Sequence, residues 1–224
     1  MGVVKIMKKI IFSLVLLSSS TALQAGLING GFESPSITPG TPSSDFISTL
    51  QGWETTDTHF EVWSDGFNGV TSYEGAQHIE LNAFINGTLS QTISPILATT
   101  QVGFQFAHRG RSGDDIMNLT ITDLGINNLI GGGDDTELFS KNYTTGNTAW
   151  SFYTDIGETP ILAIGNNIVF AYSAISSAGG VGSGNFLDNV DFGVNVGSVP
   201  EPTSLILVSL SLAGLMFSSK KKTI

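Results

Sequence analysis

Cysteine is absent from the 224-residue chain. Without cysteine there is no disulfide to cross-link a domain and no thiol to act as a nucleophile. A folded domain in this chain must therefore be held together by apolar packing or by a bound metal ion. The sequence also lacks the Gly-x-Ser-x-Gly and His-Glu-x-x-His signatures of two hydrolase classes, so it does not predict an enzyme.

Positive charge is nearly missing between residues 26 and 198. This segment holds three cations, Arg109, Arg111 and Lys141, against eighteen Asp and Glu residues, which gives a formal net charge of −15. Such a surface repels nucleic acid and anionic membranes, so we expect no nucleic-acid partner. It does suit calcium, a hard cation that binds oxygen ligands.

Apolar runs long enough to mark a helix occur only near the ends of the chain. Near the N-terminus, Lys5, Lys8 and Lys9 precede a short apolar stretch at 10–17, and small residues lead up to Ala25. This order is typical of a secretory signal peptide, whose apolar part is too short to span a bilayer. We predict a signal helix over residues 1–25, cleaved after Ala25, with cleavage after Ala22 as the alternative.

The C-terminal end combines three features in a fixed order. Val199-Pro200-Glu201-Pro202 comes first, an apolar run at 205–217 follows, and Lys220, Lys221 and Lys222 come last. The prolines keep the chain around Glu201 extended, because they cannot continue a helix or a strand ladder. The segment 203–219 would form a helix of roughly 25 Å, the short end of a bilayer span. The lysines favour the cytoplasmic side, so the rest of the chain would lie outside.

This arrangement resembles the sorting signal of the PEP-CTERM proteins of Gram-negative bacteria. The resemblance implies that an exosortase recognises Pro200-Glu201-Pro202, removes the helix, and releases or attaches the protein at the cell exterior. Before that step the protein would be anchored transiently in the inner membrane. We therefore predict a signal peptide at 1–25, one domain at 26–198 and a sorting signal at 199–224. An ordinary C-terminal membrane anchor is the alternative.

Apolar and polar residues alternate with period two along the middle segment, which is typical of half-buried strands. The stretches are 60–63, 79–82, 102–107, 117–122, 168–172 and 190–196. Turn-forming clusters rich in Gly, Asn and Asp separate them. Many short strands, each with one apolar face, predict an all-β domain of two packed antiparallel sheets, with a terminal helix on either side.

Two short motifs bracket this domain. Asn29-Gly30-Gly31-Phe32-Glu33 lies near its start and Asp188-Asn189-Val190 near its end. Together they resemble the two ends of galactose-binding-like jelly rolls, the fold of many carbohydrate-binding modules. The resemblance implies an antiparallel jelly-roll β-sandwich in which both motifs meet and share a structural calcium ion, with Glu33 and Asp188 as side-chain ligands. Alternatively, the two carboxylates only accept hydrogen bonds from the backbone of adjacent strands.

One surface of the sandwich is a candidate ligand site. If Phe60, Val62, Ile79 and Leu81 point into the core, the residues between them point outward and share one face when the two strands are neighbours. These outward residues are His59, Glu61, Trp63, His78, Glu80 and Asn82. An exposed indole among carboxylate and amide groups is typical of sugar recognition. The alternative is that a loop covers Trp63.

These observations favour an exported, non-catalytic protein that binds extracellular polysaccharide at a cell surface or in a biofilm matrix. A structural or adhesive matrix protein without a sugar site is the first alternative, and a buried Trp63 would favour it. A glycoside hydrolase is the second. It would need two carboxyls, such as Glu61 and Glu80, facing each other across a cleft at roughly 5–10 Å.

Overall fold

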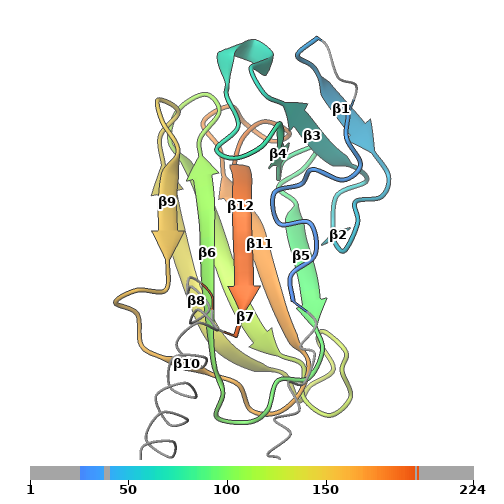
Figure 1. Cartoon of the computed structure of the whole chain (residues 1–224), viewed down its shortest axis with the longest axis vertical. Coiled ribbons are helices and arrows are strands. Elements are labelled where there is room, and N and C mark those ends of the chain that lie inside the picture. The colour runs from blue at the N-terminus through green and yellow to red at the C-terminus, as the bar shows by residue number, and fades with distance from the viewer. Residues whose placement is uncertain (1–25, 38–40, 195, 197–224) are drawn as a thin grey trace, which may run out of the picture.

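The computed structural model of the chain describes residues 26–37, 41–194 and 196 (Figure 1). These residues form an antiparallel jelly-roll β-sandwich, which confirms the predicted fold class. The predicted signal helix, transmembrane helix and sorting motif lie outside the described residues. Among the residues that are described, no helix has the length and apolar character needed to cross a membrane. The predicted domain limits, 26 and 198, stay a prediction.

Two sheets face each other in the sandwich. The first has the strand order β1-β3-β4-β12-β6-β10, with β9 also paired to β6, and the second has the order β2-β5-β11-β7-β8. The strands of the first sheet are β1 (Ser44–Ile47), β3 (Phe60–Ser64), β4 (Gln77–Glu80), β6 (Gln101–Arg109), β9 (Ser151–Thr154), β10 (Ile161–Leu162) and β12 (Phe186–Gly193). Those of the second are β2 (Glu54–Thr55), β5 (Thr88–Ile93), β7 (Asp115–Asp123), β8 (Thr136–Thr145) and β11 (Ile168–Ser176). A single 3-10 turn, η1 (Phe67–Gly69), follows β3.

Apolar side chains from both sheets form the main core between them. In β6 the residues Val102, Phe104 and Phe106 are buried in this core, while Gly103 and Gln105 point to the outer face. The same alternation holds in β7, so the period-two prediction is confirmed for both strands. The rings of Phe170 in β11 and Phe192 in β12 stack with centroids 3.9 Å apart and thus join the two sheets.

The two bracketing motifs lie side by side, as predicted. The backbone N–H of Val190 donates to the carbonyl of Gly30 at 2.9 Å. The start of the domain therefore runs along the last strand, β12, beyond the first residue of β4.

Strands β3 and β4 differ from the predicted half-buried strands, because both of their faces are buried. They are neighbours with Trp63 opposite His78 and Glu61 opposite Glu80, so these four side chains do share the outer face. However, every residue from Phe60 to Trp63 and from Gln77 to Glu80 is buried. The expectation that the outer side chains reach solvent is wrong here, because a second apolar cluster covers this part of the sheet. It contains Trp63, Val70 and Phe186, with Phe67 and Trp150 packed against them.

Candidate functional site

The predicted ligand face is instead a closed layer around Trp63, which is only 1% exposed. The indole N–H of Trp63 donates to Glu61 Oε1 at 3.0 Å. The ring packs edge-on against Phe67 and Phe186, with centroids 4.7 and 4.8 Å away. The ring cannot stack on a sugar in this conformation, so the predicted exposure of Trp63 is wrong.

Glu61 and Glu80 form a buried acid pair beside Trp63. Arg111 donates from Nη1 to both carboxylate oxygens of Glu80 at 3.1 Å, and its guanidinium carbon lies 4.7 Å from the Trp63 ring centroid. Burial, and next the neighbouring Glu61, raise the pKa of Glu80 to about 8. Burial also raises the pKa of Glu61. The single positive charge of Arg111 thus lies beside two carboxyl groups, and the Glu61–Glu80 pair retains a proton at neutral pH.

The other predicted face residues have structural partners. His78 is fully buried, its Nδ1 lies 3.0 Å from Ser72 Oγ, and burial, with Arg109 nearby, lowers its pKa to about 3. Asn82 is fully buried and bonds to Asn86 and Asn185. His59 alone is half-exposed, with its ring edge-on to Phe84. None of these groups lines a common open site with Trp63.

Glu33 and Asp188 anchor one segment of backbone. Glu33 Oε1 accepts from the N–H groups of Ala76 and Gln77 at 2.8 and 2.9 Å. Asp188 Oδ2 accepts from those of Tyr73 and Glu74 at the same two distances. Gly75 sits between these pairs at φ +64°, and a Cβ there would collide with the Glu33 carboxylate.

This bonding bears on the predicted calcium ion. Backbone N–H groups occupy Oε1 of Glu33 and both carboxylate oxygens of Asp188. Within the described ranges no three His, Asp or Glu side chains gather as a metal site. The residues therefore do not fit a closed calcium site through side chains alone, and calcium at Glu33 and Asp188 stays a prediction.

A different part of the outer face is open. Phe152 of β9 and Tyr73 from the η1–β4 loop are 42–43% exposed, and their rings are nearly parallel, at 2°, with centroids 5.7 Å apart. Trp150 lies edge-on to Tyr73 at 6.3 Å and is fixed by its indole N–H, which donates to the Thr71 carbonyl at 2.8 Å. The pair is therefore an aromatic platform held in place by a third ring.

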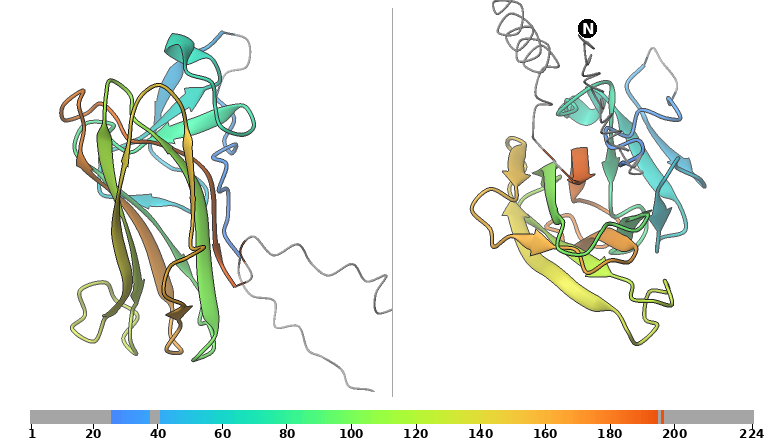
Figure 2. Two further views of the ribbon diagram at one scale, coloured as in Figure 1. Left: turned by 90° about the vertical axis from the view of Figure 1, so that its left-hand side faces the viewer. Right: turned by 60° about the horizontal axis from the view of Figure 1, so that its bottom comes forward.

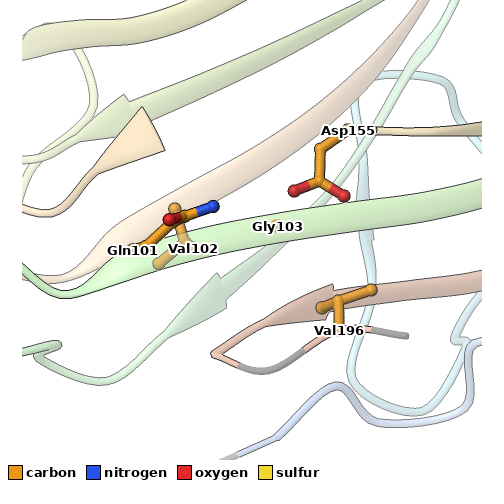
Figure 3. Close-up of a pocket in the computed structure, with 5 residues that line it drawn as sticks. All are labelled: Gln101, Val102, Gly103, Asp155 and Val196. Atoms are coloured by element: carbon orange, nitrogen blue, oxygen red, sulfur yellow. The ribbon is translucent and has the colours of Figure 1, made fainter. Parts of the chain in front are cut away.

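Small and polar residues continue from this platform along the sheet. Cross-strand pairs place Phe152, Ala107 and Asp188 in one row, and Thr154, Gln105 and Asp191 in the next. Further along β6, a pocket of about 260 Å³ is lined by Gln101, Val102, Gly103, Asp155 and Val196 (Figure 3). We call the surface from Tyr73 and Phe152 through Gln105 and Asp191 to Asp155 the open strip. From Ala107 to Gln101 it extends about 20 Å, at about 3.3 Å per residue.

Asp191 and Asp155 lie on the open strip, and among the described residues no free cation does. Burial raises the pKa of Asp191. It also raises the pKa of Asp188, which is fully buried beside the strip, to about 7. The nearest cation, Arg109, donates from Nε and Nη2 to the Asn147 carbonyl at 3.1 and 2.7 Å. The strip thus offers hydrogen-bond acceptors and donors without an anion-binding group.

No local pattern in the sequence marks the rings of Tyr73 and Phe152 as a platform. The residues Tyr73 and Phe152 lie far apart in the chain and in segments without a common motif. The outward position of Phe152 could have been found from period-two alternation in 151–154, since Tyr153 packs into the core.

The fold has distant counterparts among solved structures. One is a carbohydrate-binding module, TmCBM61, in complex with β-1,4-galactotriose, with a TM-score of 0.47, 16% identity, and coverage of 75% of this chain and 97% of that chain. A family 22 carbohydrate-binding module of Clostridium thermocellum Xyn10B has a TM-score of 0.47, 14% identity, and coverage of 71% and 95%. The K2 cleaved adhesin domain of Lys-gingipain has a TM-score of 0.43, 14% identity, and coverage of 69% and 100%. At these values no ligand and no residue role transfers to this chain.

Comparison of the C-terminal segment with known families gives a more specific result than comparison of the fold. No curated protein matches the sequence. Residues 198–222 match the PEP-CTERM protein-sorting motif, which confirms the predicted resemblance of the C-terminal end. The chain thus carries a PEP-CTERM sorting motif, which implies export and passage through a membrane-anchored state.

Proposed function

We propose that this protein is an exported, non-catalytic polysaccharide-binding protein of a bacterial cell surface or extracellular matrix, released from its anchor by an exosortase. The observation that carries the proposal is the pair of nearly parallel, exposed rings of Tyr73 and Phe152 at the head of the open strip. Exposed aromatic faces pack against the C–H faces of sugar rings, and the polar groups beyond can bond to hydroxyls.

The negative charge of the open strip favours a neutral polysaccharide over an acidic one. Asp191 and Asp155 line it and Arg109 is engaged elsewhere, so a polymer of uronic acids would meet repulsion there. A neutral polysaccharide would not. A single platform binds weakly, so repeated engagement along a polymer is needed for firm retention.

A non-catalytic role agrees with the state of the acid pair. Glu61 and Glu80 are 5% and 2% exposed and are bound by Trp63 and Arg111. A substrate cannot reach them in this conformation, which weighs against the glycoside hydrolase alternative.

Retention of the full chain on immobilised polysaccharides tests the proposal, with galactan and xylan as neutral probes and alginate as the acidic probe. We expect retention on at least one neutral probe and none on alginate. The variants Tyr73→Ala and Phe152→Ala should each lose it. Phe46→Ala is the matched control, because Phe46 is 46% exposed and stacks on Phe84 instead. Equal loss in the control, or binding by both strip variants, would refute the strip as the site.

A structural or adhesive matrix protein without a sugar site is the second candidate, favoured by the burial of Trp63. It predicts no retention on any sugar probe, together with association of the chain with itself or with other matrix proteins.

A further inference from the structure

The end of the sandwich toward which β12 runs is unusually apolar. Four side chains there are 64–89% exposed, namely Leu97, Ile126, Leu129 and Ile130. They lie in the β5–β6 and β7–β8 loops. Exposed aliphatic groups gathered in this way on a soluble domain mark an interaction surface.

Strand pairing places these loops at one end. Ile168, the first residue of β11, pairs with both Ile93 at the end of β5 and Asp123 at the end of β7. Backbone bonds then tie the loops together, from Leu124 N–H to the Asn167 carbonyl at 2.9 Å and from Thr99 N–H to the Ala163 carbonyl at 2.8 Å. Figure 2 shows these loops together at the lower end of the sandwich in its left-hand view.

The last strand leads the chain toward the same end. Gly193, at the end of β12, pairs with Gly103, close to the start of β6 and to the β5–β6 loop. In Figure 1 the arrow of β12 points toward these loops. Only residues 197–204 separate Val196 from the apolar run at 205–217, and eight residues reach at most about 28 Å.

We propose that the apolar loop end, defined by Leu97, Ile126, Leu129 and Ile130, rests in the lipid interface while the C-terminal segment anchors the chain. The short connection holds this end close to the bilayer, and aliphatic side chains gain by leaving water for the boundary of the acyl region. The partner is a zwitterionic lipid surface. The acidic domain disfavours an anionic one, and Asp134 and Asp135 stand in the same loop as Ile126. Contact with lipid would keep the domain in a fixed orientation and would end once the anchor is removed.

The absence of cysteine makes a direct test simple, because a single introduced cysteine is labelled uniquely. The full chain carries a fluorophore at Leu97→Cys or, at the opposite end, at Val181→Cys, where Val181 is 71% exposed. Each is reconstituted in phosphatidylcholine vesicles that contain lipids with a nitroxide on the upper acyl chain. We expect quenching at position 97 and none at 181. Equal quenching at both positions, or none at either, would overturn the proposal.

A second set of variants separates insertion from mere tethering. Ile126→Ser, Leu129→Ser and Ile130→Ser combined should remove the quenching at position 97, and Val181→Ser should leave it unchanged. Unchanged quenching in the triple variant would overturn the role of these side chains. The inference rests on the C-terminal anchor of the proposed function, but none of these measurements involves a sugar, so their failure would leave the proposed sugar site untouched.

Discussion

The guanidinium group of Arg111 lies over the ring of Trp63, with its central carbon 4.7 Å from the ring centroid. Arg111 is also the cation that binds Glu80, so it joins the acid pair to the aromatic cluster on the outer face. Such a contact is favourable when the ring and the cation are shielded from water. This layer is packed like a second core, so substitutions in it should lower stability as core substitutions do.

Replacing Trp63 should therefore unfold the domain or lower its stability strongly. We expect Trp63→Ala to cost about 3–5 kcal/mol in the free energy of unfolding, because it leaves a cavity and removes the indole N–H donor from Glu61. Chemical denaturation measures this loss. Tyr73→Ala is the control, and its exposed ring should cost far less. A Trp63→Ala variant as stable as the parent would show that the ring is not packed as described.

Above about pH 7 stability should fall as pH rises. Below that pH the buried His78 and His108, whose pKa values burial lowers from 6.5, give the opposite slope. The folded state holds a proton on Glu80 up to a pKa of about 8, whereas the ordinary value is 4.5. Between these values the folded state binds more protons than the unfolded state, so the free energy of unfolding decreases with increasing pH. The stabilisation is fully present below about pH 4.5 and lost above about pH 8. Asp188, with a pKa raised to about 7, acts in the same direction.

Melting temperatures between about pH 7 and pH 9, where the histidines are neutral in both states, would check this slope. Glu80→Gln should flatten it and leave the part that Asp188 contributes. Glu137→Gln, at an exposed position of β8, should keep the parent profile. A melting temperature that rises across this range would contradict the assignment of a shared proton.

Replacing Tyr172 with phenylalanine should stabilise the domain. Its hydroxyl is buried in the main core and, within the described part of the chain, has no hydrogen-bond partner. Removing it should raise the free energy of unfolding by about 1 kcal/mol, or the melting temperature by about 2–4 °C. Tyr153→Phe is the matched control. Its hydroxyl bonds to Thr145 Oγ1 at 2.8 Å, so this change should lower the melting temperature. A lower melting temperature for Tyr172→Phe would show that this hydroxyl has a hydrogen-bond partner.

Glu33 should stabilise the domain without metal. Glu33→Ala leaves the N–H groups of Ala76 and Gln77 without their acceptor, which should cost about 1–3 kcal/mol both with and without a chelator. Glu74→Ala, at a neighbouring exposed carboxyl, is the control. If instead a chelator lowers the parent's melting temperature and Glu33→Ala abolishes that effect, the predicted calcium ion is present.

The sorting motif should govern release. Replacing Pro200, Glu201 and Pro202 with alanine should leave the chain at full length in the inner-membrane fraction, because the exosortase would lose its recognition element. Fractionation and immunoblotting of the host measure this. The matched change, alanine at Thr203 and Ser204, should be processed normally. Normal release of the triple variant would refute processing at this motif.

The sequence by itself determined the main core strands, the C-terminal sorting motif and the absence of disulfides. The alternation in 102–107 and 117–122 appears unchanged in β6 and β7, since one face of each strand must be buried between the sheets. Likewise, the sorting motif is local, and its residues are adjacent in the chain.

Only the tertiary structure decided where the open surface lies. Alternation separates the two faces of a strand, but it does not reveal what covers the outward face. Above β3 and β4 that cover comes from Phe67 in the following turn and from the remote residues Trp150 and Arg111, which together bury Trp63. The platform of Tyr73 and Phe152 likewise joins a loop and a strand that no local pattern relates. Its formation depends on chain segments meeting in space, which period and composition do not encode.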